Sequence, residues 1–198
     1  MCIRDRSEIV RSIENRQLNL DDLTYDINDS STIDTLKLSL EDKDEFKKLF
    51  AIDLLRTLPL SPWKETIQNQ FLSASDKVKR GILELCWLQR EIITNDMIIN
   101  QIHLKDEISP HAISCAIDRN ITKNIKDIDS FLIESNDHLK FSALVVMLND
   151  PYRSKKAIDI INQTLIDGGE KEITKLLHFL KHSDYDISEH LILKYLNS

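Results

Sequence analysis

Apolar residues recur with helical spacing in four segments of the chain. Each segment begins with an aspartate, and apolar residues follow two, six, ten and eleven positions later. These positions lie on one side of an α-helix, so the pattern predicts four amphipathic helices. An acid at the start of a helix suits its free N–H groups and the positive end of its dipole. The four predicted helices cover residues 44–55, 76–87, 106–117 and 137–148.

The four segments also repeat at a nearly constant interval. Their leading residues Asp44, Asp76, Asp106 and Asp137 are 32, 30 and 31 positions apart. Another helix is predicted before each of the last three segments, over 62–72, 96–102 and 125–133. Serine or aspartate followed by proline at 61–62, 109–110 and 150–151 predicts helix starts. Further helices are predicted over 152–166, 173–180 and 187–196.

No single helix pair of this kind can bury its apolar side alone, so neighbouring pairs must cover it. The predicted fold is therefore all-α: an α-solenoid of stacked antiparallel helix pairs with a repeat of about 31 residues. We expect this helical-repeat domain to span residues 34–198, and Gly168 and Gly169 to terminate one of its helices.

The beginning of the chain has a different character. Residues 1–18 form an N-terminal segment whose first six residues resemble a translated sequencing adapter, so we leave these six out of the fold prediction. Their presence raises the hypothesis that the chain is a piece of a longer protein.

Negative charge is concentrated in the acidic stretch, residues 19–45. This stretch contains nine acids and two bases, which accounts for the whole net charge of −7. We expect a solvated loop and helix start there, and the alternative is a contact surface for a basic partner. Acids and bases balance over the rest of the chain, which argues against a large phosphate-binding surface.

The scarcity of glycine excludes several function classes. The chain has three glycines, Gly81, Gly168 and Gly169. A dinucleotide-binding fingerprint needs three glycines in one turn and a P-loop needs two around one loop, so neither is present. Tight hairpin turns also depend on glycine, which disfavours a fold rich in strands.

The apolar residues and cysteines predict a protein of a reducing compartment. No stretch approaches the roughly 18–20 uncharged apolar residues of a membrane span, and we expect no secretory signal. Cys2, Cys86 and Cys115 lack the spacing of metal ligands, and the last two have apolar neighbours. We therefore expect reduced core thiols and a cytoplasmic location.

The repeated segments resemble those of the HEAT or armadillo-like superfamily of α-solenoids. The resemblance rests on the opening acid, the apolar residue two positions on and the base that follows. Asp76, Val78 and Lys79 show this pattern, whereas the segment at 106 lacks the base, and Pro62 alone supplies the proline expected in each first helix. The resemblance covers residues 34–148, and 150–198 only loosely. It implies stacked helix pairs and a binding role rather than catalysis.

Few residue patterns suggest metal binding or catalysis. His178 and His182 are four positions apart on a predicted helix, with Asp184 and Asp186 nearby, so they are a candidate metal pair. The same spacing arises easily on a solvated helix side. The helix also lacks the glutamate of a zinc-protease motif.

Two further patterns are candidates for catalysis. His111 and Cys115 have the spacing of a base and a thiolate, but Cys115 adjoins apolar residues and no third group is evident. Asp127 with Asp129, and Asp184 with Asp186, are spaced so that they point to different sides of a helix or cap a turn. We therefore predict no catalytic residue, no metal ligand and no cofactor.

The positions four and five beyond each leading aspartate fall outside the predicted buried stripe. They would form a ridge along one surface, and its candidate partner-binding residues are Lys48, Arg80, His111 and Phe141. Trp63 has two interpretations, as a core residue or as an exposed anchor for a partner. Trp87 lies on the apolar stripe and is predicted to be in the core.

Three functions are compatible with the sequence. The leading prediction is a non-enzymatic scaffold or adaptor that binds another protein and is a module of a longer chain. The alternative is a nucleic-acid-binding solenoid similar to the DNA-repair glycosylases with HEAT-like repeats. The third is a metal-dependent or thiol enzyme that uses the histidines or Cys115.

Overall fold

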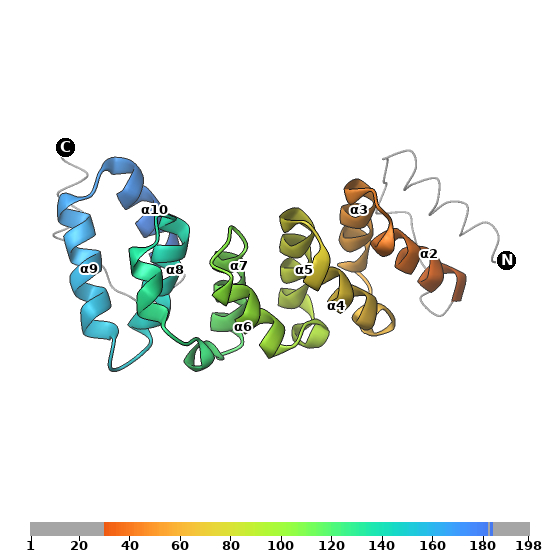
Figure 1. Cartoon of the computed structure of the whole chain (residues 1–198), viewed down its shortest axis with the longest axis horizontal. Coiled ribbons are helices and arrows are strands. Elements are labelled where there is room, and N and C mark those ends of the chain that lie inside the picture. The colour runs from red at the N-terminus through yellow and green to blue at the C-terminus, as the bar shows by residue number, and fades with distance from the viewer. Residues whose placement is uncertain (1–29, 182, 184–198) are drawn as a thin grey trace. The chain divides into compact units, whose positions relative to one another are not determined.

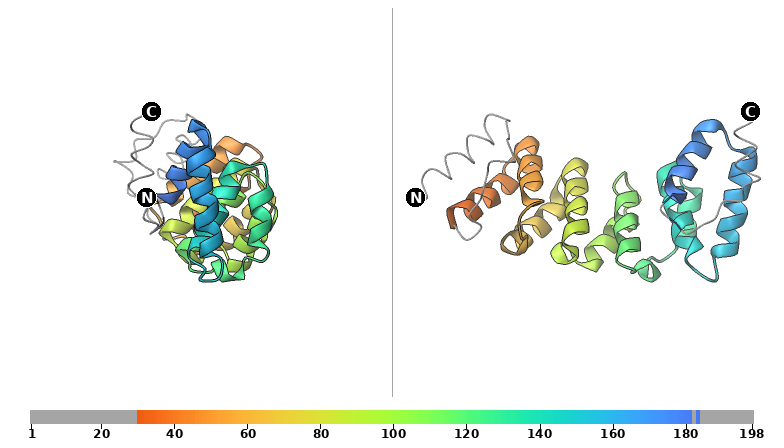
Figure 2. Two further views of the ribbon diagram at one scale, coloured as in Figure 1. Left: turned by 90° about the vertical axis from the view of Figure 1, so that its left-hand side faces the viewer. Right: turned by 180° about the vertical axis from the view of Figure 1, so that it is seen from behind.

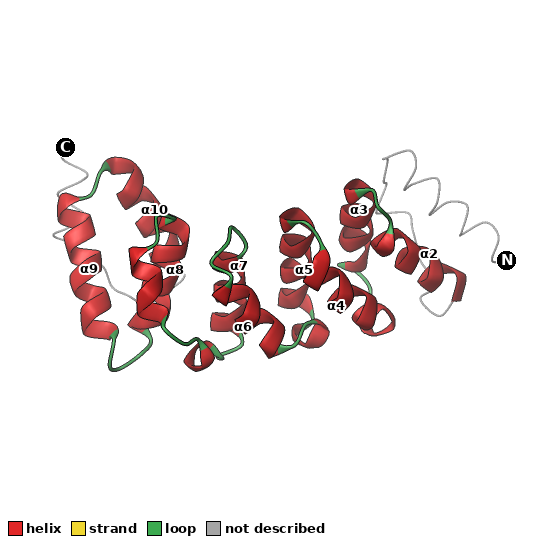
Figure 3. Cartoon of the chain, in the orientation of Figure 1, coloured by secondary structure: helices red, strands yellow, loops and turns green. Residues whose placement is uncertain are grey.

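The computed structural model describes residues 30–181 and 183. Every regular element in this part of the chain is helical, and no strand occurs in it (Figure 3). The all-α prediction is therefore confirmed. The chain divides into two compact units between Ile98 and Ile99. The segment 1–18, most of the acidic stretch and the helix predicted over 187–196 lie outside the described residues.

From residue 30 on, the first unit consists of two α-helical hairpins and short 3-10 turns (Figure 1). Its elements are α2 (Ser30–Glu41), α3 (Glu45–Leu55), η2 (Ser61–Trp63), α4 (Lys64–Ser73), α5 (Asp76–Leu88), η3 (Arg90–Ile92) and the start of α6 (Asn95–His103). Helix α3 packs against α2 and α5, and α4 packs against the same two helices. These contacts enclose the core of the unit.

Helix α2 lies in the acidic stretch, where the sequence predicts a loop and only a helix start. Its buried side combines Leu36 and Leu40 with the hydroxyl residues Thr32, Thr35 and Ser39. The Ser39 hydroxyl donates a hydrogen bond to the carbonyl of Thr35, one turn earlier, which satisfies it inside the core. Because three of these five buried residues carry hydroxyl groups, the apolar period is too weak to predict the helix.

The acids that lead the repeated segments meet helix N-termini in different ways. Asp44 caps α3 by accepting a hydrogen bond from the N–H of Phe46 at 2.9 Å. Asp76 and Asp137 are instead the first residues of their helices. Helix α7 begins three residues after Asp106, whose carboxylate accepts from the N–H of Ser109. An acid therefore stands at or just before each of these helix starts, but the helix predicted from residue 106 begins only at Ser109, and Asn136 caps α8.

The proline-containing helix starts differ from the prediction. Ser61 does not cap α4, because it begins the 3-10 turn η2 and α4 starts at Lys64. Ser109 is the first residue of α7, and its hydroxyl donates to the carbonyl of Gln101. Asp150 accepts from the N–H of Tyr152 in the turn before the next helix.

The second unit is built around one central helix (Figures 1 and 2). After the rest of α6 come α7 (Ser109–Asp118), η4 (Thr122–Asn124), η5 (Ile128–Ile133), α8 (Asp137–Leu148), α9 (Ser154–Asp167) and α10 (Glu170–Leu180). Helix α8 contacts α7, η5, α9 and α10. Every residue from Phe141 to Met147 is consequently buried.

The prediction of an α-helix over 125–133 is wrong. This segment forms 3-10 turns, and Asp127 between them adopts a left-handed conformation with φ of 52°. The buried residues Ile125, Ile128 and Phe131 are three positions apart. Ile128 and Phe131 belong to η5, and their spacing of three matches the period of a 3-10 helix, so both side chains face the core.

The described glycines have ordinary backbone conformations, and Gly81 is explained by the close approach of a neighbouring helix. The prediction that Gly168 and Gly169 follow the end of a helix is confirmed, and Gly168 has an ordinary φ of −69°. Gly81, predicted to lie on the exposed ridge, is half-buried where α5 contacts α3. A Cβ atom at Gly81 would lie 3.2 Å from Cγ2 of Ile52 and 3.9 Å from Cδ2 of Leu49. The absence of a side chain therefore allows the two helices to pack.

We predict that Gly81→Leu lowers the free energy of unfolding by about 1–3 kcal/mol, because the side chain overpacks the contact with α3. Gly81→Ala should be near neutral, since its methyl group crowds Ile52 while alanine gains up to about 1 kcal/mol of helix propensity. Urea denaturation followed by circular dichroism measures both. Asn100→Leu, at an exposed position of α6, is the control. An equal loss in the control would contradict the steric explanation.

Candidate functional site

One side of α5 is exposed along the whole helix. It carries the residues that we call the α5 face: Asp76, Arg80, Glu84, Trp87 and Leu88. They follow one another at intervals of three or four positions, or are adjacent, so they lie on one side of the helix. The opposite side, with Val78, Ile82 and Leu85, is in the core. The α5 face is therefore displayed on a well-anchored helix.

Trp87 is the main correction to the sequence analysis. It was predicted to be in the core, but its side chain is 54% exposed and the adjacent Leu88 is 56% exposed. The core side of α5 is already filled by Ile82, Leu85 and Cys86. The run from Leu85 to Leu88 contains more apolar residues than one helical stripe can hold, and this excess is the sequence signal for an exposed apolar pair.

The charged residues of the α5 face differ in whether they form an ion pair. The carboxylate of Glu84 accepts a hydrogen bond from the guanidinium of Arg56 on α3. Arg56 also pairs with Asp53, with 3.0 Å between Nε and Oδ1. Among the described residues, no side chain forms an ion pair or hydrogen bond with Arg80 or Asp76.

The beginning of α5 is tied to α3 by polar contacts. The Ser75 hydroxyl donates a hydrogen bond to the carboxylate of Glu45, and the ammonium of Lys77 lies 3.5 Å from the same carboxylate. The hydrogen bond from Ser75, helped by the charge of Lys77, lowers the pKa of Glu45. These contacts fix the register between α3 and α5.

The other predicted ridge residues are less accessible. Lys48 is half-buried, and its Nζ donates to Oε1 of Gln70 at 2.6 Å. His111 is also half-buried. The ridge of Lys48, Arg80, His111 and Phe141 is thus exposed fully only at Arg80.

Trp63 is a core residue, and the hypothesis that it is an anchor for a partner is wrong. Its side chain has 0% exposure, and its Nε1 donates a hydrogen bond to the carbonyl of Ile33 on α2 at 3.1 Å. The 3-10 turn η2, which contains Pro62, turns the indole into the unit. Trp63 therefore joins η2 to α2.

Phe141 is also buried with 0% exposure, so the prediction that it lies on a surface ridge is wrong. Helix α10 packs over this side of α8, and the ring of Phe179 lies 6.2 Å from that of Phe141. The sequence from Phe141 to Leu148 has no charged residue, which indicates a helix covered on all sides.

Comparison with known proteins does not assign the chain to a family. No family model matches the chain, and no match was found among curated proteins or solved structures.

The described residues do not support the catalytic hypotheses. Cys115 is buried with 2% exposure, which keeps its thiol from a substrate, and Cys86 is buried as predicted. His178 is exposed, whereas His182, Asp184 and Asp186 lie outside the described residues. Within the described part of the chain, no cluster of three or more metal-binding side chains occurs. Nor does any helix of that part combine the length and apolar character needed to cross a membrane.

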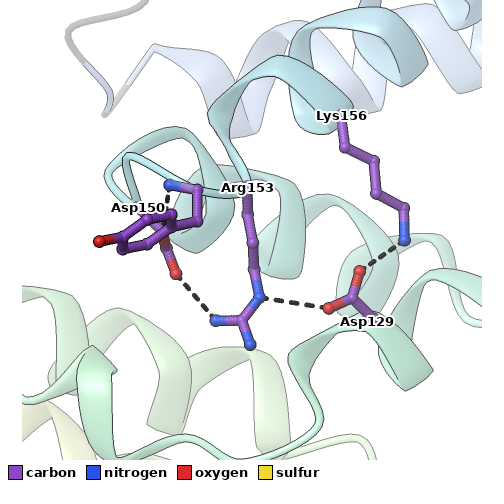
Figure 4. Close-up of polar contacts among 5 residues, drawn as sticks. Asp129, Asp150, Arg153 and Lys156 are labelled. Atoms are coloured by element: carbon purple, nitrogen blue, oxygen red, sulfur yellow. Dashed lines mark hydrogen bonds and ion pairs between the residues drawn. The ribbon is translucent and has the colours of Figure 1, made fainter.

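Asp129, proposed above as half of a carboxylate pair, belongs to an ion-pair cluster (Figure 4). Its carboxylate lies 2.5 Å from Nζ of Lys156 and 3.2 Å from Nε of Arg153. Arg153 also contacts Asp150 at 2.8 Å. The hydrogen bond from Lys156 and the charge of Arg153 lower the pKa of Asp129, which is unsuitable for a general acid. The cluster joins η5 to the first turn of α9.

We predict that the two tryptophans differ in their contribution to stability. Trp63→Ala should lower the free energy of unfolding by about 3–5 kcal/mol, because it removes a large core side chain. Trp87→Ala should lower it by less than about 1 kcal/mol, as expected of a surface position. Urea denaturation measures both. Acrylamide quenching provides the second test, since Trp87→Phe should remove the fluorescence that acrylamide can quench. Equal losses of unfolding free energy in the two alanine variants would contradict the assignment.

We also predict that Asp129→Asn lowers the free energy of unfolding by about 0.5–1 kcal/mol at pH 7, as expected for exposed ion pairs. The folded-state pKa of Asp129 is lowered. Its contribution is therefore present above the unfolded pKa of about 3.9 and is lost as pH falls through the folded value.

Urea denaturation at several pH values should show the difference between wild type and variant shrinking below about pH 5. Asp159→Asn removes an exposed carboxylate from α9, the helix that Asp129 contacts through Lys156, and is the matched control. A difference that persists in acid would contradict the role of the ion pairs.

Proposed function

We propose that the chain is a non-enzymatic helical-repeat scaffold or adaptor and that its α5 face binds another protein. The observation that carries this proposal is the half-exposed Trp87, on the same side of α5 as Arg80. Tryptophan and arginine are the residues most enriched in the energetic centres of protein interfaces. A rigid helix that displays both loses little conformational entropy on binding.

The contacts between α3 and α5 support a repeat architecture of the HEAT or armadillo-like kind. Glu45 and Lys77 each follow their leading aspartate by one position, and they form an ion pair. Leu49 and Gly81 each follow it by five positions and face one another. Equivalent residues of successive segments thus lie side by side, as they do in stacked repeats.

The charge pattern of the α5 face favours a protein partner over nucleic acid. Asp76 and Glu84 lie on either side of Arg80 along the helix. A phosphate backbone would meet a carboxylate on each side of Arg80, and of the neighbouring cations Lys77 is already paired with Glu45.

The test is affinity purification of crosslinked partners from cells that express the tagged chain. We expect Trp87→Ala and Arg80→Glu each to reduce recovery of the specific partner by about tenfold, the effect of losing an interface hot spot. Tyr152→Ala and Lys126→Glu remove an exposed aromatic and an exposed cation from the second unit, so they are the matched controls.

Two outcomes would contradict the proposed function. One is a partner that both α5 variants retain at the wild-type level. The other is a purified chain with an enzymatic turnover of its own.

A further inference from the structure

Helix α10 covers on α8 the side that is open on α5. Phe141 and Arg80 are equivalent, because each follows its leading aspartate by four positions. Phe141 is buried and Arg80 is exposed. The difference comes from α10, whose Phe179 ring lies 6.2 Å from the ring of Phe141 and 5.5 Å from that of His138.

Two ion pairs accompany this aromatic contact. Asp137 pairs with Lys175 of α10 at 2.9 Å, and Lys140 pairs with Glu172 at 3.2 Å. Helix α10 therefore presents an acid, a base three positions later and an aromatic residue seven positions after the acid. This order is the pattern that α8 binds.

Helix α5 repeats the receiving half of these contacts. Asp76 and Lys79 have the places that Asp137 and Lys140 have on α8. Among the described residues, neither Asp76 nor Lys79 has a side-chain partner in a hydrogen bond or ion pair. Where α8 has His138 and Phe141, α5 has the cations Lys77 and Arg80.

From this equivalence we infer that the α5 face binds an amphipathic helix of a partner protein. This helix carries an acidic residue, a basic residue three positions on and an aromatic residue seven positions on. The inference rests on the proposed function and specifies the chemistry of its partner. The aromatic ring of the partner stacks on Arg80, a favourable cation–π arrangement. Trp87 and Leu88 receive apolar residues at the other end of the helix.

The test uses the full chain and a peptide of residues 169–181, which carries the α10 pattern. A staple between positions 170 and 174, which are exposed in α10, holds the short peptide in a helix. Binding is followed by fluorescence anisotropy of the labelled peptide and by the emission of Trp87. The site on α8 stays filled by the α10 of the chain itself, because that contact is intramolecular.

We expect the peptide to bind with a micromolar to millimolar Kd and to shift the Trp87 emission to shorter wavelength. Glu172→Lys with Lys175→Glu in the peptide should weaken binding about tenfold, since two attractive pairs become repulsive. Asp76→Lys with Lys79→Glu in the chain should restore it. Asp76→Asn with Lys79→Gln is the milder variant, and it should weaken the original peptide without favouring the swapped one.

Several outcomes would overturn the inference. They are the absence of peptide binding up to millimolar concentration, and a swapped peptide that the swapped chain does not prefer. A concentration-dependent dimer that Trp87→Ala dissociates would make a second copy the partner instead. A large loss of stability in Asp76→Asn with Lys79→Gln would show that the chain itself covers this face. If the peptide fails while Trp87→Ala still releases the crosslinked partner, the proposed function stands without this partner chemistry.

Discussion

The main constraint on the described part of the chain is that apolar helix sides need neighbours beyond the next helix in sequence, as α3 has in α5 and α8 has in α10. In the second unit α8 meets this constraint, because it is enclosed by α7, η5, α9 and α10 and has a buried side chain at every position from Phe141 to Met147. The first unit meets it only in part, because α5 keeps Trp87 and Leu88 at its surface. The burial of the other helices, and the accessibility of the α5 face, follow from which sides have a neighbour.

Polar contacts between helices set the positions at which these apolar sides meet. Ser75 and Lys77 bind Glu45, and Arg56 binds Glu84, so α3 and α5 are tied at both ends around the contact at Gly81. Each pair is exposed and contributes little energy by itself. Together they favour one register among those that a plain apolar contact would allow.

The regular part of the fold could be predicted from the sequence, whereas exposure at single positions could not. The leading acids and the apolar spacing predicted helices where α3, α5, α7 and α8 lie. Helix α2 was missed because Thr32, Thr35 and Ser39 share its buried side, and the 3-10 turns over 128–133 were taken for an α-helix because their buried residues are three apart.

The candidate site was predicted only at Arg80. Trp87 and Phe141 were assigned to the wrong environments because helical spacing identifies a side of a helix without showing whether another helix covers it. That depends on α10, which is distant in sequence from Phe141 and packs against it only in the folded unit.

The uniform burial of α8 also affects how the chain behaves before it is folded. Residues 141–148 form an uncharged run of eight that contains adjacent valines and no proline or glycine. Such a segment is soluble only while its neighbours enclose it, and in an extended chain it has the composition of segments that pair as β-strands between molecules. By packing on α8, α9 and α10 therefore also shield this run from other copies of the chain.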